Sequence, residues 1–305
     1  MNGVRLRVGL LAVLAGMGGT VAFAQDLIAD APHVCDPCEE WNGTREPFRV
    51  YGNTWSVGTA GLGSILITSP QGHILIDGGL PQSAPLIAKN IETAGFRLRD
   101  IKLILNSHTH YDHAGGIAAL VRATGAPVAA SPASKRALER GGPMEDDPQF
   151  SFGAKHNNYA PVAKVRAIAD GETLKVGPLA VTAHFTPGHT PGGTSWTWRE
   201  CEGQRCLSLV YADSLNSVSA PDYRFSANAS TAASFARSIR VVEALPCDIL
   251  LAPHPVLIDL DAKLQRWKEN PTVNPLIDTG ACKAYAQAAR ERLETRVAEE
   301  RAGTQ

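Results

Sequence analysis

The sequence carries no excess of charge of either sign. Lysine and arginine number 29 against 30 for aspartate and glutamate, so the formal net charge is −1 at pH 7. Nucleic acids and anionic lipid surfaces attract proteins through a concentrated basic field, which a balanced chain does not supply. The composition therefore disfavours a nucleic-acid partner and indicates a small molecule that is recognised locally.

The sequence also lacks a linker rich in proline, glycine or serine, a short-period repeat and a low-complexity segment. It has 305 residues, 44% of them hydrophobic, and is therefore able to bury a large core. These features favour one domain over two, and we expect that domain to span residues 25–305.

No apolar run reaches the roughly 20 residues that a helix needs to cross a bilayer. The most apolar stretch, VGLLAVLAGMGGTVAF, follows two arginines and ends close to Ala22-Phe23-Ala24, whose small residues suit a cleavage site. This arrangement is typical of a secretory signal peptide. We therefore expect residues 1–24 to be removed on export, leaving no membrane span.

Cysteine is scarce but even in number, with six residues in all, which fits an oxidising destination. Cys201 and Cys206 flank the polar turn EGQR, where a bridge would close the end of a β-hairpin. Cys247 follows a helical pattern and Cys282 begins the last one, so a bond between them would hold the C-terminal helix to the body.

The remaining pair, Cys35 and Cys38, forms a C-x-x-C motif. A local bridge, a redox pair and half of a zinc knuckle are all compatible with this spacing. The sequence has no second C-x-x-C, and no βαβ pattern flanks the motif, so the local bridge is favoured.

Apolar runs alternate between strand and helix patterns, and several of them end at polar residues. The run IKLIL predicts a buried strand that leads into NSHTHYDHAGG, and GGIAALVRATG predicts the helix that follows. Helices are also expected in SAPLIAKNIETAGF, in TAASFARSIRVVEAL, near 261–269 and at 281–302. The alternating charges of the last helix favour a solvent-exposed face.

Histidine is concentrated at one place. Of nine histidines, three lie within six positions together with an aspartate: His108, His110, Asp112 and His113. Imidazole and carboxylate are the usual side-chain ligands of zinc-like ions. In an extended chain, His108 and His110 point to the same side. Asp112 and His113 lie one turn further on, where the chain enters the predicted helix. The spacing therefore predicts two neighbouring metal sites.

Other ligand-type residues follow apolar runs further along the chain. His189 lies on the turn TPGHTPGG, Asp213 and Ser214 end LSLVYADS, and His254 ends DILLAPH. Ends of strands at one edge of a sheet commonly build a shared site. We expect these residues to approach the histidine cluster, and Asp77 and Thr190 are candidates to orient the ligands.

Taken in order, H-x-H-x-D-H, TPGHTPGG, YADS and APH resemble the metallo-β-lactamase superfamily over essentially the whole mature chain. The segments VYGNTWSVGT, PGHTPGGTSWTW, YADSL and PCDILLAPHP are similar to the third subclass of class B β-lactamases, which are secreted dizinc enzymes of Gram-negative bacteria. The resemblance implies an α/β fold of the αββα type: two mixed β-sheets packed face to face, with helices outside. It also implies a periplasmic location.

The resemblance assigns the ligands residue by residue. It implies that His108, His110 and His189 hold a first Zn²⁺, and that Asp112, His113 and His254 hold a second. Asp112 is in addition a possible proton acceptor or a group that orients hydroxide.

The resemblance further implies that Ser214 and the residue at position 216 bind the substrate carboxylate. Asn216 departs from the serine or threonine common there, and Gln149 is a weaker candidate for substrate contact. Some relatives tie the N-terminal segment to a cysteine where this chain has Ala60, which leaves Cys35 to pair with Cys38.

The activity implied is hydrolysis of the β-lactam amide bond of penicillins, cephalosporins and carbapenems by a metal-bound hydroxide, which confers antibiotic resistance. A lactonase or a thioesterase of the same fold is the alternative, and a metal-binding protein without catalytic activity is a third hypothesis. We expect a monomer whose partner is a small-molecule β-lactam.

Overall fold

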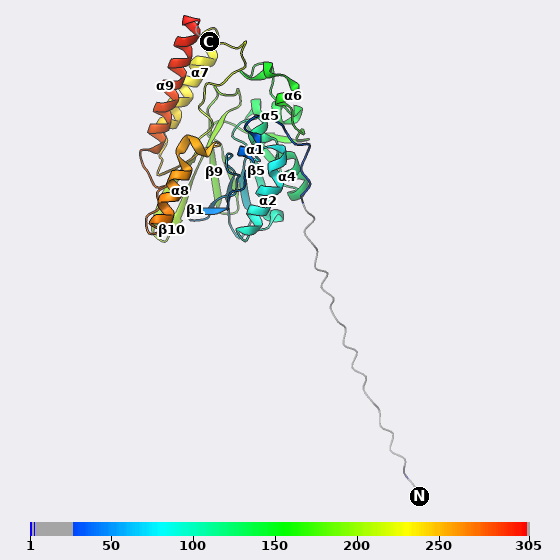
Figure 1. Ribbon diagram of the computed structural model, residues 1–305. Helices are drawn as coiled ribbons and strands as arrows, with labels where there is room; N and C mark the ends of the chain where they lie inside the picture. The colour runs from blue at the N-terminus through cyan, green and yellow to red at the C-terminus, as the bar shows by residue number, and fades with distance from the viewer. Residues whose placement is uncertain (2, 4–26, 304–305) are drawn as a thin grey trace.

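The computed structural model describes residues 1, 3 and 27–303, so the expected signal peptide falls almost wholly outside the described residues. The described residues form two β-sheets with helices on their outer faces (Figure 1). Among these residues, none of the helices combines the length and the apolar character needed to cross a bilayer.

The larger sheet has seven strands in the order β1-β2-β3-β4-β5-β6-β7. Its first four strands pair antiparallel, and β4 to β7 pair parallel. The bounds are β1 Phe48–Tyr51, β2 Thr54–Ser56, β3 Ile65–Ile67, β4 His73–Ile76, β5 Ile101–Leu105, β6 Val128–Ala130 and β7 Val165–Ala167.

The smaller sheet has five strands in the order β12-β11-β10-β9-β8. Strand β12 pairs parallel with β11, and the other pairs are antiparallel. The bounds are β8 Thr173–Val176, β9 Leu179–Phe185, β10 Thr194–Glu202, β11 Arg205–Tyr211 and β12 Ile249–Leu251.

The helices connect and cover these strands. The α-helices are α1 Cys38–Trp41, α2 Ala84–Thr93, α3 Tyr111–Ala114, α4 Ile117–Thr124, α5 Pro132–Arg140, α6 Ala154–Asn157, α7 Ala229–Ala244, α8 Leu260–Glu269 and α9 Ala281–Ala302. The 3₁₀ turns are η1 Pro81–Ser83, η2 Leu98–Asp100, η3 Phe150–Phe152 and η4 Pro255–Ile258.

Alternation of side chains along the buried strands builds two hydrophobic cores. In β4, Ile74 and Ile76 join the core between the sheets, where they meet residues such as Trp196 of the smaller sheet. Leu75 points to the opposite face and joins the core under α2 and α4, which contains Ile87. Because a strand exposes successive residues to opposite faces, a strand that is apolar throughout is covered on both sides. This arrangement confirms the expected αββα sandwich.

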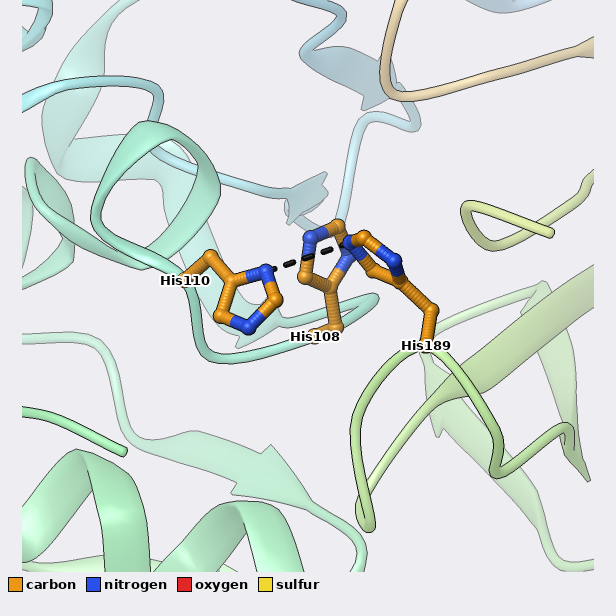
Figure 2. A group of neighbouring side chains, drawn as sticks. All are labelled: His108, His110 and His189. Atoms are coloured by element: carbon orange, nitrogen blue, oxygen red, sulfur yellow. Dashed lines mark hydrogen bonds between the residues drawn. The ribbon is translucent and has the colours of Figure 1, made fainter. Parts of the chain in front are cut away.

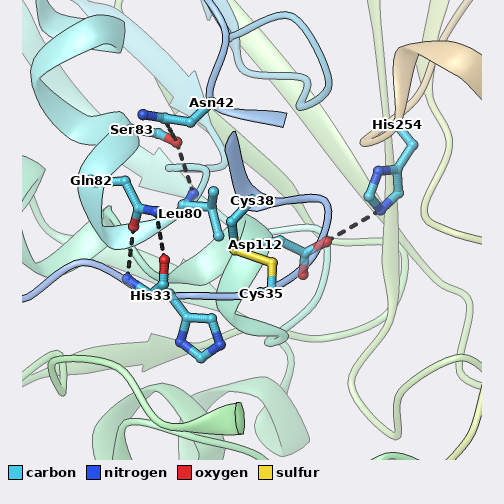
Figure 3. Close-up of a disulfide and its surroundings, with 9 residues drawn as sticks. All are labelled: His33, Cys35, Cys38, Asn42, Leu80, Gln82, Ser83, Asp112 and His254. Atoms are coloured by element: carbon cyan, nitrogen blue, oxygen red, sulfur yellow. Dashed lines mark hydrogen bonds and ion pairs between the residues drawn. A yellow bond between two sulfur atoms is a disulfide. The ribbon is translucent and has the colours of Figure 1, made fainter. Parts of the chain in front are cut away.

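The structure contains three disulfide bonds, and they join the pairs suggested by the sequence. Cys201 and Cys206 face each other directly across the β10–β11 hairpin. Cys247 is bonded to Cys282 at the start of α9, and Cys35 is bonded to Cys38 (Figure 3). The C-x-x-C is therefore a local bridge in this structure, and Cys38 is buried in a small cluster with Leu62 and Leu80.

Candidate metal centre

The histidine cluster lies where β5 ends and the chain has not yet become helical. His110 retains an extended backbone, with φ −74° and ψ 153°, and α3 begins at the next residue. The buried carboxylate of Asp77 shapes this loop, because it accepts hydrogen bonds from Ser107 N at 2.7 Å and Ser107 Oγ at 2.6 Å. Asp77 therefore orients the backbone of the loop through Ser107, whereas the sequence suggested that it orients a ligand side chain directly.

Three histidines converge at the first site (Figure 2). His110 Nδ1 lies 3.1 Å from His189 Nε2, and the buried His108 Nε2 has no hydrogen-bond partner among the described residues. Figure 2 shows His189 reaching the other two rings from a separate loop. These three nitrogen atoms lie close together without a protein donor between them. Because each neutral imidazole offers a lone pair, the arrangement fits a cation shared by the three rings.

The outer nitrogen of each of these rings has an oxygen partner. The contacts are His108 Nδ1 to Asp213 Oδ1 at 2.8 Å, His110 Nε2 to Asp147 Oδ1 at 3.1 Å and His189 Nδ1 to the Asn216 carbonyl at 2.7 Å. An oxygen at the outer nitrogen holds the N–H there and leaves the inner nitrogen free to bind a metal. The donor set therefore fits a metal ion.

A second group lies beside the first. Asp112 Oδ2 is 3.1 Å from His113 Nε2 and 3.3 Å from His254 Nε2, and the two ring nitrogens are 3.2 Å apart. His254 follows β12, and Figure 3 shows its ring pointing toward Asp112 from a different segment of the chain. One carboxylate and two imidazoles meeting at a point are again a typical donor set for zinc-like ions.

Burial dominates the electrostatics of two of the three histidines at the first site. Burial lowers the pKa of His108 well below its usual value, and the neighbouring histidines lower it further. Burial, followed by the charge of His110, lowers the pKa of His189 to about 3. Both rings are therefore neutral at pH 7, as metal ligands must be.

Two other groups respond to opposite charges. Burial alone would raise the pKa of Asp112, but the charge and hydrogen bonds of His113 and His254 outweigh it and hold the pKa well below its usual value. Burial would lower the pKa of His110, but the Asp147 carboxylate outweighs it and raises that pKa. Asp112 is thus ionised and ready to bind a cation.

The two groups open into a cavity of about 370 Å³. Ser214, Asn216 and Gln149 lie on its wall, as do Asp112 and His254. Apolar side chains complete the wall, and the ring of Trp41 lies 5.1 Å from that of His254. The cavity therefore offers polar and apolar contacts beside the candidate ligands.

The sequence did not reveal two of the groups that contact the histidines, and its suggestion for Thr190 was wrong. Asp147, the partner of His110, has no sequence feature that separates it from the adjacent Asp146. Asn216 meets His189 through its backbone carbonyl, which no side-chain pattern signals. Thr190 lines a different cavity, and its buried hydroxyl has no partner among the described residues, so it does not orient the adjacent His189 as the sequence suggested.

Comparison with known proteins agrees with this geometry. The family model of the metallo-beta-lactamase superfamily matches residues 64–202. The structure of the metallo-β-lactamase SMB-1 bound to 2-mercaptoethanesulfonate is 48% identical, with a TM-score of 0.82, and the alignment covers 85% of this chain and 99% of that one. The chain belongs to the metallo-β-lactamase superfamily.

Other solved members of the superfamily are similarly related. MEM-A1, a subclass B3 metallo-β-lactamase from a soil metagenome library, is 49% identical over 86% of this chain and 99% of its own, with a TM-score of 0.82. MIM-1 from Novosphingobium pentaromativorans is 42% identical over 87% and 94%, with a TM-score of 0.80. The structural neighbours thus include the third subclass.

The curated relatives match a smaller part of the chain, at lower identity. The hydroxyacylglutathione hydrolase of Anaeromyxobacter dehalogenans (strain 2CP-C) is 33% identical over 124 residues, which make up 41% of this chain and only 37% of that protein. The chain therefore matches little more than a third of this relative.

Proposed function

We propose that this protein hydrolyses the amide bond of β-lactam antibiotics with two zinc ions. The observation that carries the proposal is the convergence of six ligand-type side chains in two adjoining groups, four of which line one open cavity. The proposed ligands are His108, His110 and His189 for the first ion, and Asp112, His113 and His254 for the second. The similarity to SMB-1 and MEM-A1 supports β-lactams as the substrate class.

The protein's own residues prepare the reaction around that centre. Zinc held by these six side chains would act as a Lewis acid and would lower the pKa of bound water to about 7, which would make hydroxide available at neutral pH. The ionised Asp112 lies on the cavity wall, where its carboxylate either orients the attacking water or accepts its proton. Ser214 and Gln149 offer polar contacts to the substrate, while Trp41 and Phe152 exclude water from its apolar part.

The position of Asp213 favours a lactamase over the thioesterase and lactonase alternatives. In those relatives the corresponding aspartate is expected to bridge the two metals. Here one oxygen of Asp213 contacts the outer nitrogen of His108, and the other lies where a side chain at Gly193 would collide with it, at 2.3 Å from an added Cβ. The carboxylate therefore lies behind His108, at the outer nitrogen of that ring.

Assays on purified, zinc-loaded protein test the proposal. We expect turnover of a penicillin, a cephalosporin and a carbapenem, a loss of about a hundredfold or more after chelation, and recovery when zinc is restored, because zinc supplies the nucleophile. Metal analysis should give two ions per chain. Faster hydrolysis of a lactone or a thioester would favour the alternative enzymes, and metal uptake without any turnover would favour a metal-binding protein.

We further propose that the protein is exported to the periplasm and acts there as a monomer. All six cysteines are joined in disulfides, which suits an oxidising compartment. Sequencing of the exported protein should give an N-terminus near Gln25, and its mass in solution should be that of one chain. A full-length product that remains in the cytosol would contradict export.

A further inference from the structure

The connection between β11 and α7 forms part of the cavity although it contains no helix or strand. Residues 212–228 are irregular throughout, yet Ser214, Asn216 and Val218 line the cavity. An irregular segment of this length holds one conformation only when other groups satisfy its backbone.

Helix α9 supplies them at the start of the segment. The hydroxyl of Tyr285 donates to the carbonyl of Asp213 at 2.9 Å and accepts from the N–H of Leu215 at 3.2 Å. Arg292 Nη2 donates to the carbonyl of Leu215 at 3.1 Å, and Ser217 Oγ donates to the carbonyl of Arg292 at 3.3 Å. Both peptide groups that flank Ser214 are therefore held by one buried tyrosine.

The same face of α9 continues along the rest of the segment. Arg296 Nη2 donates to Ser219 Oγ at 2.9 Å, and Glu300 accepts from Ser226 N at 2.7 Å. Residues spaced by seven and four positions share one helix face. The expected solvated face exists on the side of α9 that carries the exposed Glu291, whereas the polar groups on this side of α9 bind the loop.

The opposite side of the segment contacts two of the ligands proposed for the first metal. Asp213 Oδ1 meets His108 Nδ1 at 2.8 Å, and the Asn216 carbonyl meets His189 Nδ1 at 2.7 Å. Residues 213–216 thus lie between α9 and two of the three histidines. Any displacement of this segment moves both oxygens that fix the ring orientations.

Helix α9 is itself firmly anchored. It packs beside α7 (Figure 1). Near its first residue, Cys282 is bonded to Cys247. Further along the helix, Ala286 and Leu293 are buried in the hydrophobic core. A fixed helix is able to hold the loop in one place.

We propose that α9 sets the affinity of the first metal site, with Tyr285 and Arg292 as positioning residues. They fix the backbone of residues 213–216, which in turn fixes the hydrogen bonds to the outer nitrogens of His108 and His189. Neither residue touches the metal position. The inference rests on the proposed metal centre and adds to it a dependence on a helix outside the cavity.

Tyr285→Phe tests the proposal because it removes only the hydroxyl. The metal-free variant is titrated with zinc against a chromophoric chelator, which yields two affinities without any assay of activity. We expect one affinity to fall about tenfold, at the lower end of the effect of losing an outer partner of a ligand, and the other to stay within twofold.

Tyr51→Phe is the matched control. Its side chain is buried, and its hydroxyl also donates to a backbone carbonyl, that of Arg205 at 2.8 Å, at the far end of the β10–β11 hairpin. We expect it to lose thermal stability to a similar degree while both zinc affinities stay at the wild-type values. If Tyr51→Phe lowered the zinc affinities as much as Tyr285→Phe does, the proposal would be overturned, because a general loss of stability would then explain the weaker zinc binding.

Arg292→Met provides a second variant if Tyr285→Phe does not fold, and Arg292→Lys restores a donor. We expect Arg292→Met to lower one zinc affinity and Arg292→Lys to retain most of it. Wild-type affinities in Tyr285→Phe or in Arg292→Met would overturn this inference alone. A wild-type protein that takes up no zinc would overturn the proposed function, and the inference with it.

Discussion

His110→Ala is expected to reduce kcat/KM for β-lactam hydrolysis by about a hundredfold or more. The substitution removes the nitrogen that faces His189 at 3.1 Å and leaves the first site with two of its three proposed ligands. It also removes the imidazole ring that contacts the buried carboxylate of Asp147. A metal that is weakly held no longer supplies hydroxide efficiently. Steady-state kinetics together with metal analysis measure the effect.

His184→Ala is the control for this experiment. His184 lies in β9, where its ring contacts Thr197 across the sheet at 2.8 Å, outside the cavity. We expect this variant to retain two metals and near wild-type turnover. A folded His110→Ala protein with near wild-type turnover would show that the first site has been assigned wrongly.

Removal of the Cys247–Cys282 bond is expected to lower the free energy of unfolding by roughly 3 to 4 kcal/mol. The two cysteines are 35 positions apart, so the bond excludes many conformations from the unfolded chain. Cys282 is buried, and alanine is therefore the appropriate replacement at both positions. Urea unfolding of Cys247→Ala/Cys282→Ala at fixed zinc concentration measures the loss.

Cys201→Ala/Cys206→Ala provides a graded comparison. These cysteines are five positions apart and already face each other across the β10–β11 hairpin. We expect a loss of about 2 kcal/mol, because a short loop has less closure entropy to remove. A larger loss for this pair than for Cys247 and Cys282 would contradict the explanation from loop closure.

The predicted parts of the centre are those whose residues are close in sequence or end an apolar run. Spacing of two places His108 and His110 on the same side of an extended chain, and the structure brings them together with His189. The helix that starts at Tyr111 turns Asp112 and His113 toward a second group. The two-sheet sandwich, by contrast, was predicted from resemblance and not from periodicity.

The unpredicted parts depend on contacts between distant segments. Asp147 reaches His110 from an irregular loop, and the Asn216 carbonyl reaches His189 from another. Tyr285 holds that second loop from a helix whose charge pattern indicated only exposure to solvent. Backbone carbonyls carry no side-chain signal, and a tyrosine in a helical pattern is usually interpreted as part of a core.

The sequence by itself determined which side chains are available as ligands and how the neighbouring ones are oriented, because backbone geometry fixes directions over a few residues. It also determined which cysteines pair across a hairpin. Only the tertiary structure decided which oxygen lies behind each histidine and that α9 supports the loop at the cavity. Those partners are chosen by the packing of segments far apart in the chain, and packing depends on the whole fold.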